Sequence, residues 1–259
     1  MRITFIVILA VALLNTLSAQ TDSSGIRQNI VEAKILIQKA TNTADQGLFA
    51  KAENLLGPAR AETHFAALGN YYLGYAAYKR CMILLQVDKD KAVAYLDTAV
   101  CRLEEAVSRE EAFAEAYALL SSCIGMKIGF APAEAMVLGP KSFAALAQAK
   151  ELAPNNPRVV MAGALSTYNT PEMYGGSKER GFEEMKKAAG LYDHWTSADS
   201  LQPDWGKDEI WAWIGIAHME RKEMIQAKRA LDRSLEINPG NGWVKHVLLP
   251  KLAAQAESK

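Results

Sequence analysis

The chain has 259 residues, half of them hydrophobic, and its 29 basic and 29 acidic side chains cancel to a formal net charge of zero. A neutral chain lacks the basic surface expected of a nucleic-acid-binding protein, so no nucleic-acid partner is predicted. The length is sufficient to bury a large core, as one extended domain or two small ones.

The amino terminus has the pattern of a secretory signal peptide. Arg2 precedes an apolar run over residues 3–14, and Ser18-Ala19 offers a small-residue cleavage site. The run is shorter than the roughly 20 residues of a membrane span, although an uncleaved anchor is the alternative. We therefore expect residues 1–19 to be removed and residues 20–259 to be a soluble periplasmic or secreted protein, with membrane contact only before cleavage. The absence of a nearby Cys predicts no lipid attachment.

Three cysteines, Cys81, Cys101 and Cys123, lie in segments with helical patterns. An odd number in an exported protein leaves at least one free thiol. Small buried core residues are the favoured interpretation, and a bridge between Cys101 and Cys123, or between Cys81 and Cys101, is the alternative.

The first half of the chain predicts two helical hairpins, at residues 26–64 and 66–111. Apolar residues recur at helical spacing from Ile26, and Pro58 favours a shortened or kinked second helix. In the second hairpin, 25 residues separate Gly74 from Ala99, which leaves 13 more than the minimal spacing. That excess contains no Gly or Pro, so we expect a longer second helix that starts near Asp90.

Two further hairpins, at residues 114–154 and 157–193, carry long connections between their helices. The connection GFAPAEAMVLGP predicts a loop packed by Met136, Val137 and Leu138. The connection NTPEMYGG ends in Gly175-Gly176, which predicts a turn that leads into a helix capped by Ser177. An insertion with Trp195 and Trp205 then precedes the last hairpin.

The fifth hairpin, at residues 208–239, shows the clearest periodicity, and residues 242–257 predict a capping helix. Its first half has the spacing W-x2-L-G-x2-Y and its second half A-x3-F-x2-A-x4-P, carried by Trp211, Ile214, Gly215 and His218, then Ala227, Leu231, Ser234 and Pro239. Small residues at Gly215 and Ala227 allow two antiparallel helices to approach closely.

These residues resemble a tetratricopeptide repeat (TPR), and the weaker copies of the spacing extend the resemblance over nearly all of the mature chain. The resemblance implies an all-α superhelix of about five degenerate hairpins. The segments LGP, NTPEMYGG and WVKHVLLPKL also resemble exported TPR proteins of Gram-negative bacteria, including the TPR-type T component of TRAP transporters.

No catalytic or metal-binding pattern is present in the sequence. The four His residues show no paired ligand spacing, and neither a G-x-S-x-G nor a Walker motif occurs. The glycine-rich YGGSKERG precedes a helix but lacks a preceding strand, so a phosphate cradle is the weaker interpretation. Paired carboxylates such as Glu104-Glu105 are interpreted as residues on solvent-exposed helix faces. We expect a non-enzymatic protein without a cofactor.

Helical-repeat superhelices bind through the first helices of their hairpins, which line the concave face. Offsets from Gly215 assign ten binding candidates to this inner face: Tyr71, Tyr75, Tyr78, Met126, Arg158, Met161, Tyr168, Asn169, Ile216 and Met219. Aromatic and Met side chains suit an apolar or amphipathic partner, which predicts a protein or peptide partner for a scaffold. The alternatives are a transport accessory that encloses an apolar small molecule, and a face that the inserted loops fill.

Overall fold

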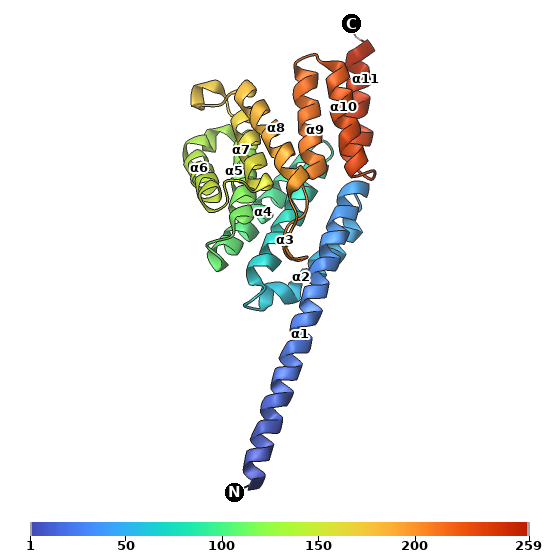
Figure 1. Cartoon of the computed structure of the whole chain (residues 1–259). Helices are drawn as coiled ribbons and strands as arrows, with labels where there is room; N and C mark the ends of the chain where they lie inside the picture. Colours follow the sequence, from blue (N-terminus) through green and yellow to red (C-terminus); the bar gives the residue numbers. More distant parts are fainter. Residues whose placement is uncertain (1, 258–259) are drawn as a thin grey trace.

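The computed structural model describes the backbone of residues 2–257 and the side chains of residues 23–256. Within this range the chain is all-α and contains no strand, and successive helices form hairpins, which confirms the predicted superhelical repeat fold (Figure 1). The predicted signal peptide involves side chains outside this range. None of the helices in the described part has both the length and the apolar character needed to span a membrane.

The hairpins are α1–α2, α3–α4, α5–α6, α7–α8 and α9–α10, and α11 follows them. The helices are α1 (Arg2–Thr43), α2 (Gln46–Ala61), α3 (Ala66–Leu84), α4 (Lys89–Arg109), α5 (Ala114–Phe130), α6 (Ala135–Leu152), α7 (Pro157–Asn169), α8 (Lys178–His194), α9 (Lys207–Glu220), α10 (Met224–Ile237) and α11 (Leu249–Glu257). Three short helical turns are η1 (Pro132–Glu134), η2 (Glu172–Tyr174) and the π-helical η3 (Val244–Leu248).

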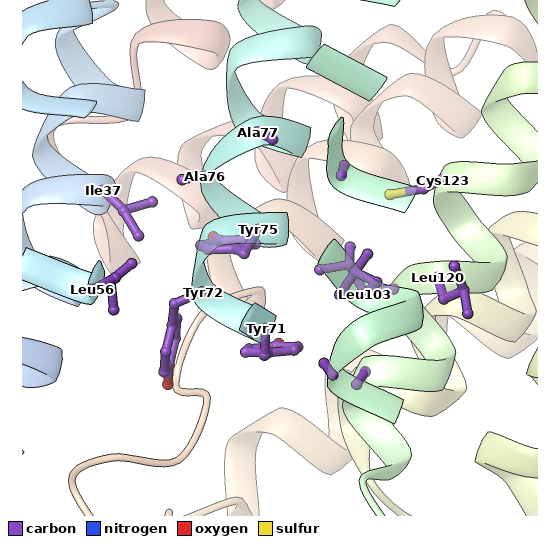
Figure 2. Packing of buried hydrophobic residues seen from close by; sticks show 14 of the residues in the cluster. Ile37, Leu56, Tyr71, Tyr72, Tyr75, Ala76, Ala77, Leu103, Leu120 and Cys123 are labelled. Atoms are coloured by element: carbon purple, nitrogen blue, oxygen red, sulfur yellow. The ribbon is translucent and has the colours of Figure 1, made fainter. Parts of the chain in front are cut away.

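Small residues at one position of the repeat allow the helices of a hairpin to approach closely. A Cβ atom added at Gly215 would lie 2.7 Å from the Leu231 side chain, and one added at Gly74 would lie 2.8 Å from Leu103. Leu231 and Leu103 occupy the same position of their repeats and are fully buried. The glycine on one helix therefore receives the leucine of the next, as ridges-into-grooves packing requires. Figure 2 shows Leu103 among the buried side chains of this core.

The extra residues of the second hairpin lengthen both of its helices. Helix α3 continues to Leu84, and α4 begins at Lys89 behind Asp88, whose carboxylate accepts from the Lys91 backbone N–H. This agrees with the expected start of that helix near Asp90. Pro58 lies inside α2, and α2 nevertheless continues to Ala61.

The connection in the third hairpin differs from the prediction. Met136 and Val137 were expected to pack inside a loop, but they lie on the first turn of α6 and are exposed. The prediction was wrong because Gly139 and Pro140 were read as loop residues, whereas α6 includes both. Pro140 is the sixth residue of α6, so the helix continues there without the hydrogen bond that a backbone N–H would donate to the Met136 carbonyl.

The cysteines are all free thiols, so neither proposed bridge is present. Cys81 and Cys123 are buried, and burial raises the pKa of the Cys81 thiol to about 11. Cys101 is exposed, which corrects the expectation that all three are core residues. It lies on the outward face of α4, whose buried residues are Ala99 and Leu103 on either side of it.

The two ends of the array meet. The Asn42 side chain near the end of α1 exchanges two hydrogen bonds, of 3.1 and 3.0 Å, with the Asn238 side chain after α10. A Cβ atom at Gly242 would lie 2.4 Å from the Asn42 carbonyl oxygen. The end of α1 therefore lies against the segment that leads into α11 (Figure 1).

Candidate functional site

The inner face at the tyrosines of α3 is covered by the segment 195–206, which we call the closing loop. Trp205 of this loop stacks on Tyr75 with ring centroids 4.6 Å apart, and its indole N–H donates to the Tyr71 hydroxyl at 2.9 Å. The Tyr72 hydroxyl donates to the Leu201 carbonyl at 2.6 Å. The loop thus fills the concavity here, which is the alternative that the sequence left open.

The closing loop is held from α1 as well. The Lys34 ammonium donates to the carbonyl oxygens of Ser200 and Gln202 at 2.6 and 2.7 Å. Arg27 forms an ion pair of 3.0 Å with Asp199. Because α1 and the loop are far apart in sequence, these contacts tie the first hairpin to the connection between the fourth and fifth.

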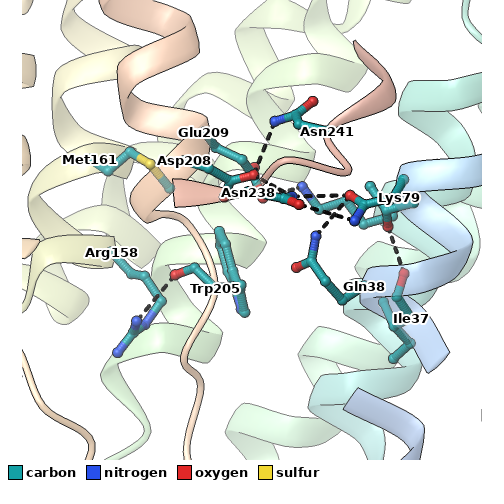
Figure 3. A network of polar contacts seen from close by, with 12 residues as sticks. Ile37, Gln38, Lys79, Arg158, Met161, Trp205, Asp208, Glu209, Asn238 and Asn241 are labelled. Atoms are coloured by element: carbon teal, nitrogen blue, oxygen red, sulfur yellow. Dashed lines mark hydrogen bonds and ion pairs between the residues drawn. The ribbon is translucent and has the colours of Figure 1, made fainter. Parts of the chain in front are cut away.

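A buried ion pair lies beside the loop. Lys79 Nζ is 2.6 Å from Glu209 Oε1, and the side chains are 7% and 16% exposed (Figure 3). The ammonium is also 5.3 to 5.7 Å from the ring centroids of Tyr75, Tyr78 and Trp205. Burial raises the pKa of Glu209, and Lys79 opposes this shift. The pair therefore joins α3 to α9 inside an aromatic enclosure.

Arg158 has structural partners on three sides. It forms an ion pair of 3.4 Å with Glu115. Its Nη1 donates to the Trp205 carbonyl at 3.2 Å (Figure 3). Its guanidinium lies over the Trp195 ring, 5.4 Å from the centroid. Arg158 therefore positions the closing loop. Its ion pair with Glu115 is the pairing with a neighbouring Glu that the sequence left open as an alternative to ligand binding.

The other predicted inner-face residues have mostly internal contacts. Met161, Tyr168 and Met219 are buried, Met126 and Ile216 are half-buried in the core, and Asn169 is exposed. The Tyr168 hydroxyl donates to Glu220, which also pairs with Lys178. The ten residues do lie along the first helices, but none of them lines either of the two cavities described below.

A different surface is open. We call it the insert cleft: a cavity of about 150 Å³ between α6, α7 and η2, lined by Phe143, Leu146, Lys150, Ser166, Thr167, Thr170, Tyr174, Gly175 and Gly176. Large apolar side chains stand exposed in and beside it, with Phe143 at 50%, Tyr174 at 61% and the neighbouring Met173 at 81%. Met136 lies two helical turns before Phe143, on the same side of α6, and is 82% exposed.

The glycines of NTPEMYGG give the insert cleft its shape. Gly175 has a φ of +88°, in the left-handed region that other residues avoid. A Cβ atom at Gly176 would lie 1.7 Å from the Thr170 carbonyl oxygen. Ser177 then caps α8 by accepting from the Arg180 N–H, as predicted. The turn holds Tyr174 over the cleft because the two glycines let it fold back on the end of α7.

A second cavity, which we call the arginine pocket, has a volume of about 310 Å³ and lies between α2, α3 and α4. Each helix contributes three residues at helical spacing: Glu53, Gly57 and Arg60; Leu73, Ala77 and Arg80; Tyr95, Thr98 and Arg102. Arg80 pairs with Glu53 at 2.5 Å and lies over the Tyr95 ring. Leu73 and Ala77 give the pocket an apolar floor.

Sequence reasoning missed both cavities. The inserts of the third and fourth hairpins indicated a departure from a plain array, but Phe143, Met173 and Tyr174 were not singled out. A partial signal was available, since two large apolar residues between Pro171 and Gly175 are unusual for a turn, although the sequence does not report their exposure. The arginines of the pocket lie on three helices and share no sequence motif.

Comparison with known proteins identifies a similar fold and no family. No family model matches the chain, and no curated protein matches it. Among solved structures, the HusA haemophore from Porphyromonas gingivalis is similar with a TM-score of 0.58 and 22% identity, over 73% of this chain and 94% of that one. The assembly chaperone of RpL4 (Acl4) aligns with a TM-score of 0.34 and 14% identity, over 86% of this chain and 99% of that one. The first match shows a shared helical fold.

Proposed function

We propose that this chain is an exported, non-catalytic binding protein of the TPR type, and that the insert cleft anchors an apolar side chain of a protein or peptide partner. The observation that carries the proposal is the cluster of exposed Phe143, Met173 and Tyr174 around an open cavity. Water-exposed aromatic and Met side chains that gather at a cleft are typical of a protein interaction surface.

The size of the insert cleft favours a side-chain anchor over an enclosed ligand. Its volume of about 150 Å³ is below the range of roughly 300 to 1,000 Å³ for small-molecule pockets. The Lys150 side chain lies across α7, since a Cβ atom at Gly163 would be 2.8 Å from its Cε. No ion pair is formed by Lys150 in the described residues. We infer that the partner combines an aromatic or large aliphatic anchor with a nearby carboxylate for Lys150.

Peptides selected from a random display library on the full chain test this proposal. We expect enrichment of sequences with a large apolar anchor beside an acidic residue, and Phe143→Ala should weaken their binding at least tenfold in fluorescence anisotropy. Gly176→Ala should weaken it too, because the added Cβ displaces the turn from Thr170.

The matched control is Ile225→Ala, which removes an exposed aliphatic side chain on α10, far from the insert cleft in sequence. Circular dichroism should be the same for all variants. Peptides that bind Phe143→Ala as tightly as the unmodified chain would refute the assignment of this surface. Weakening by Ile225→Ala to the same extent would do so as well.

A second candidate is an amphipathic small-molecule carrier, with haem as the probe. The fold is shared with a haemophore, and the exposed Met136, Met173 and Tyr174 include side-chain types that ligate haem iron. Haem is larger than the insert cleft, so it would lie across the exposed apolar surface. The two negative propionates would favour the end near Lys150.

Absorption titration with haemin separates the two candidates. A carrier should show a saturable shift of the Soret band, and the combined Met173→Ala and Tyr174→Phe change should alter the band and weaken binding about tenfold. A featureless, non-saturating rise in absorbance that is the same in the variant would exclude haem as the ligand. This second candidate includes a role as a transport accessory that resembles the T component of TRAP transporters.

A further inference from the structure

We propose that the arginine pocket is a second binding site, independent of the insert cleft, for a small organic dianion such as a phosphate monoester or a dicarboxylate. The pocket has about 310 Å³ of volume, which is within the range of small-molecule sites. It lies on the side of the second helices α2 and α4, away from both the closing loop and the insert cleft.

The charges of the pocket are unbalanced. Three guanidinium groups line it, and Glu53 is the one acidic side chain in its lining. Glu53 is already paired with Arg80, whose Nε also donates to the Gln46 side chain at 3.0 Å. Arg60 and Arg102 form no ion pair or side-chain hydrogen bond within the described residues, so two positive charges face the cavity uncompensated.

Arg80 forms a pre-formed wall of the pocket. Arg80 is held between the Tyr95 and Phe49 rings, 4.4 and 5.6 Å from their centroids. Its side chain is largely buried, which keeps the guanidinium fixed against the wall of the pocket. Arginine forks bind phosphate and carboxylate oxygens in pairs, and two unpaired forks suit a ligand with a charge of −2.

The rest of the lining defines the body of the ligand. Leu73 and Ala77 form an apolar floor, and the Tyr95 ring forms one wall. Inorganic phosphate would leave this floor uncovered. The ligand therefore joins its anionic group to a small apolar or aromatic moiety that covers Leu73 and Ala77.

Isothermal titration calorimetry of the full chain with phenyl phosphate, phthalate, inorganic phosphate and neutral phenol tests the proposal. We expect saturable binding of phenyl phosphate or phthalate, weaker binding of inorganic phosphate and none of phenol. Tighter binding of phenyl phosphate identifies a phosphate ester, and tighter binding of phthalate identifies a dicarboxylate. Arg60→Gln and Arg102→Gln should each weaken it about tenfold, and binding should weaken with added salt.

Gly57→Leu provides a test that leaves every charge in place. A Cβ atom at Gly57 meets nothing within 4 Å, and Gly57 lines the pocket, so a leucine side chain there would occupy pocket volume. It should abolish binding while the helix content stays unchanged. Arg229→Gln, an exposed arginine on α10, is the matched control and should have no effect. Absence of saturable heat with every anion, or binding that survives Gly57→Leu and both arginine changes, would overturn the proposal.

Discussion

Lys79→Ala is expected to lower the free energy of unfolding by about 3–5 kcal/mol at pH 7, because it leaves the Glu209 carboxylate buried without its partner. The Lys79 ammonium is the only cation within ion-pair distance of Glu209 in the described structure. The variant also empties the enclosure formed by Tyr75, Tyr78 and Trp205. Urea denaturation followed by circular dichroism measures the effect.

The pH dependence of this loss has a definite sign. Burial already raises the pKa of Glu209 in the folded state above its unfolded value of about 4.3, and removal of Lys79 raises it further. A carboxyl group with a raised folded pKa contributes stability below the unfolded pKa, and that contribution is lost as pH rises through the folded pKa. The difference between variant and unmodified protein should therefore be largest at pH 7 and shrink towards pH 4.

The double variant Lys79→Met with Glu209→Gln is the control. It removes both charges at similar volume, and replacement of a buried pair by neutral groups is often nearly neutral for stability. We expect it to lie within about 1 kcal/mol of the unmodified protein. A double variant as unstable as Lys79→Ala would show that packing of the lysine stem, and not the unpaired carboxylate, accounts for the loss.

Trp205→Ala is the second large effect, with an expected loss of about 3 kcal/mol. The Trp205 side chain packs against two hydrophobic clusters, one around Tyr71 and one around Met161, so its removal separates them. It also leaves the buried Tyr71 hydroxyl without its indole donor. Hydrogen exchange should speed up in residues 195–206, and the dye ANS should gain access to the inner-face tyrosines.

Trp205→Phe separates the two contributions. It preserves the stacking on Tyr75 and removes the hydrogen bond to Tyr71, so a smaller loss of about 1–2 kcal/mol is expected. ANS binding should stay near that of the unmodified chain. If Trp205→Ala unfolds no more easily than the unmodified protein and exchange in the loop is unchanged, the closing loop is not held by this side chain.

The helices could be predicted because their signal is periodic. Gly74 and Gly215 mark where the helices of a hairpin touch, and the residues around them repeat at a fixed spacing. The offset from Gly215 predicted that Tyr71 and Tyr75 lie on the inner face. It could not report that Trp205 covers them, because the path of a loop has no period.

The helical periodicity could not predict which contacts form between distant segments or where cavities lie, because these depend on residues far apart in the sequence. Arg27 and Asp199 are 172 residues apart, and no local rule relates them. Arg60 lies on α2 and Arg102 on α4, and the two line one pocket only because both helices pack against α3. The exposure of Met173 and Tyr174 was equally invisible, since an apolar residue in a turn can lie inside or outside.

The contact between Asn42 and Asn238 changes how the array should unfold. Stacked repeats are usually quasi-one-dimensional, and they can lose their terminal units one at a time. In this chain the first hairpin is tied both to the last and, through Lys34, to the closing loop. We therefore expect the first hairpin to unfold together with the closing loop and the last hairpin, not as a free terminal unit. These sequence-distant contacts also predict slower folding than an open array of the same length.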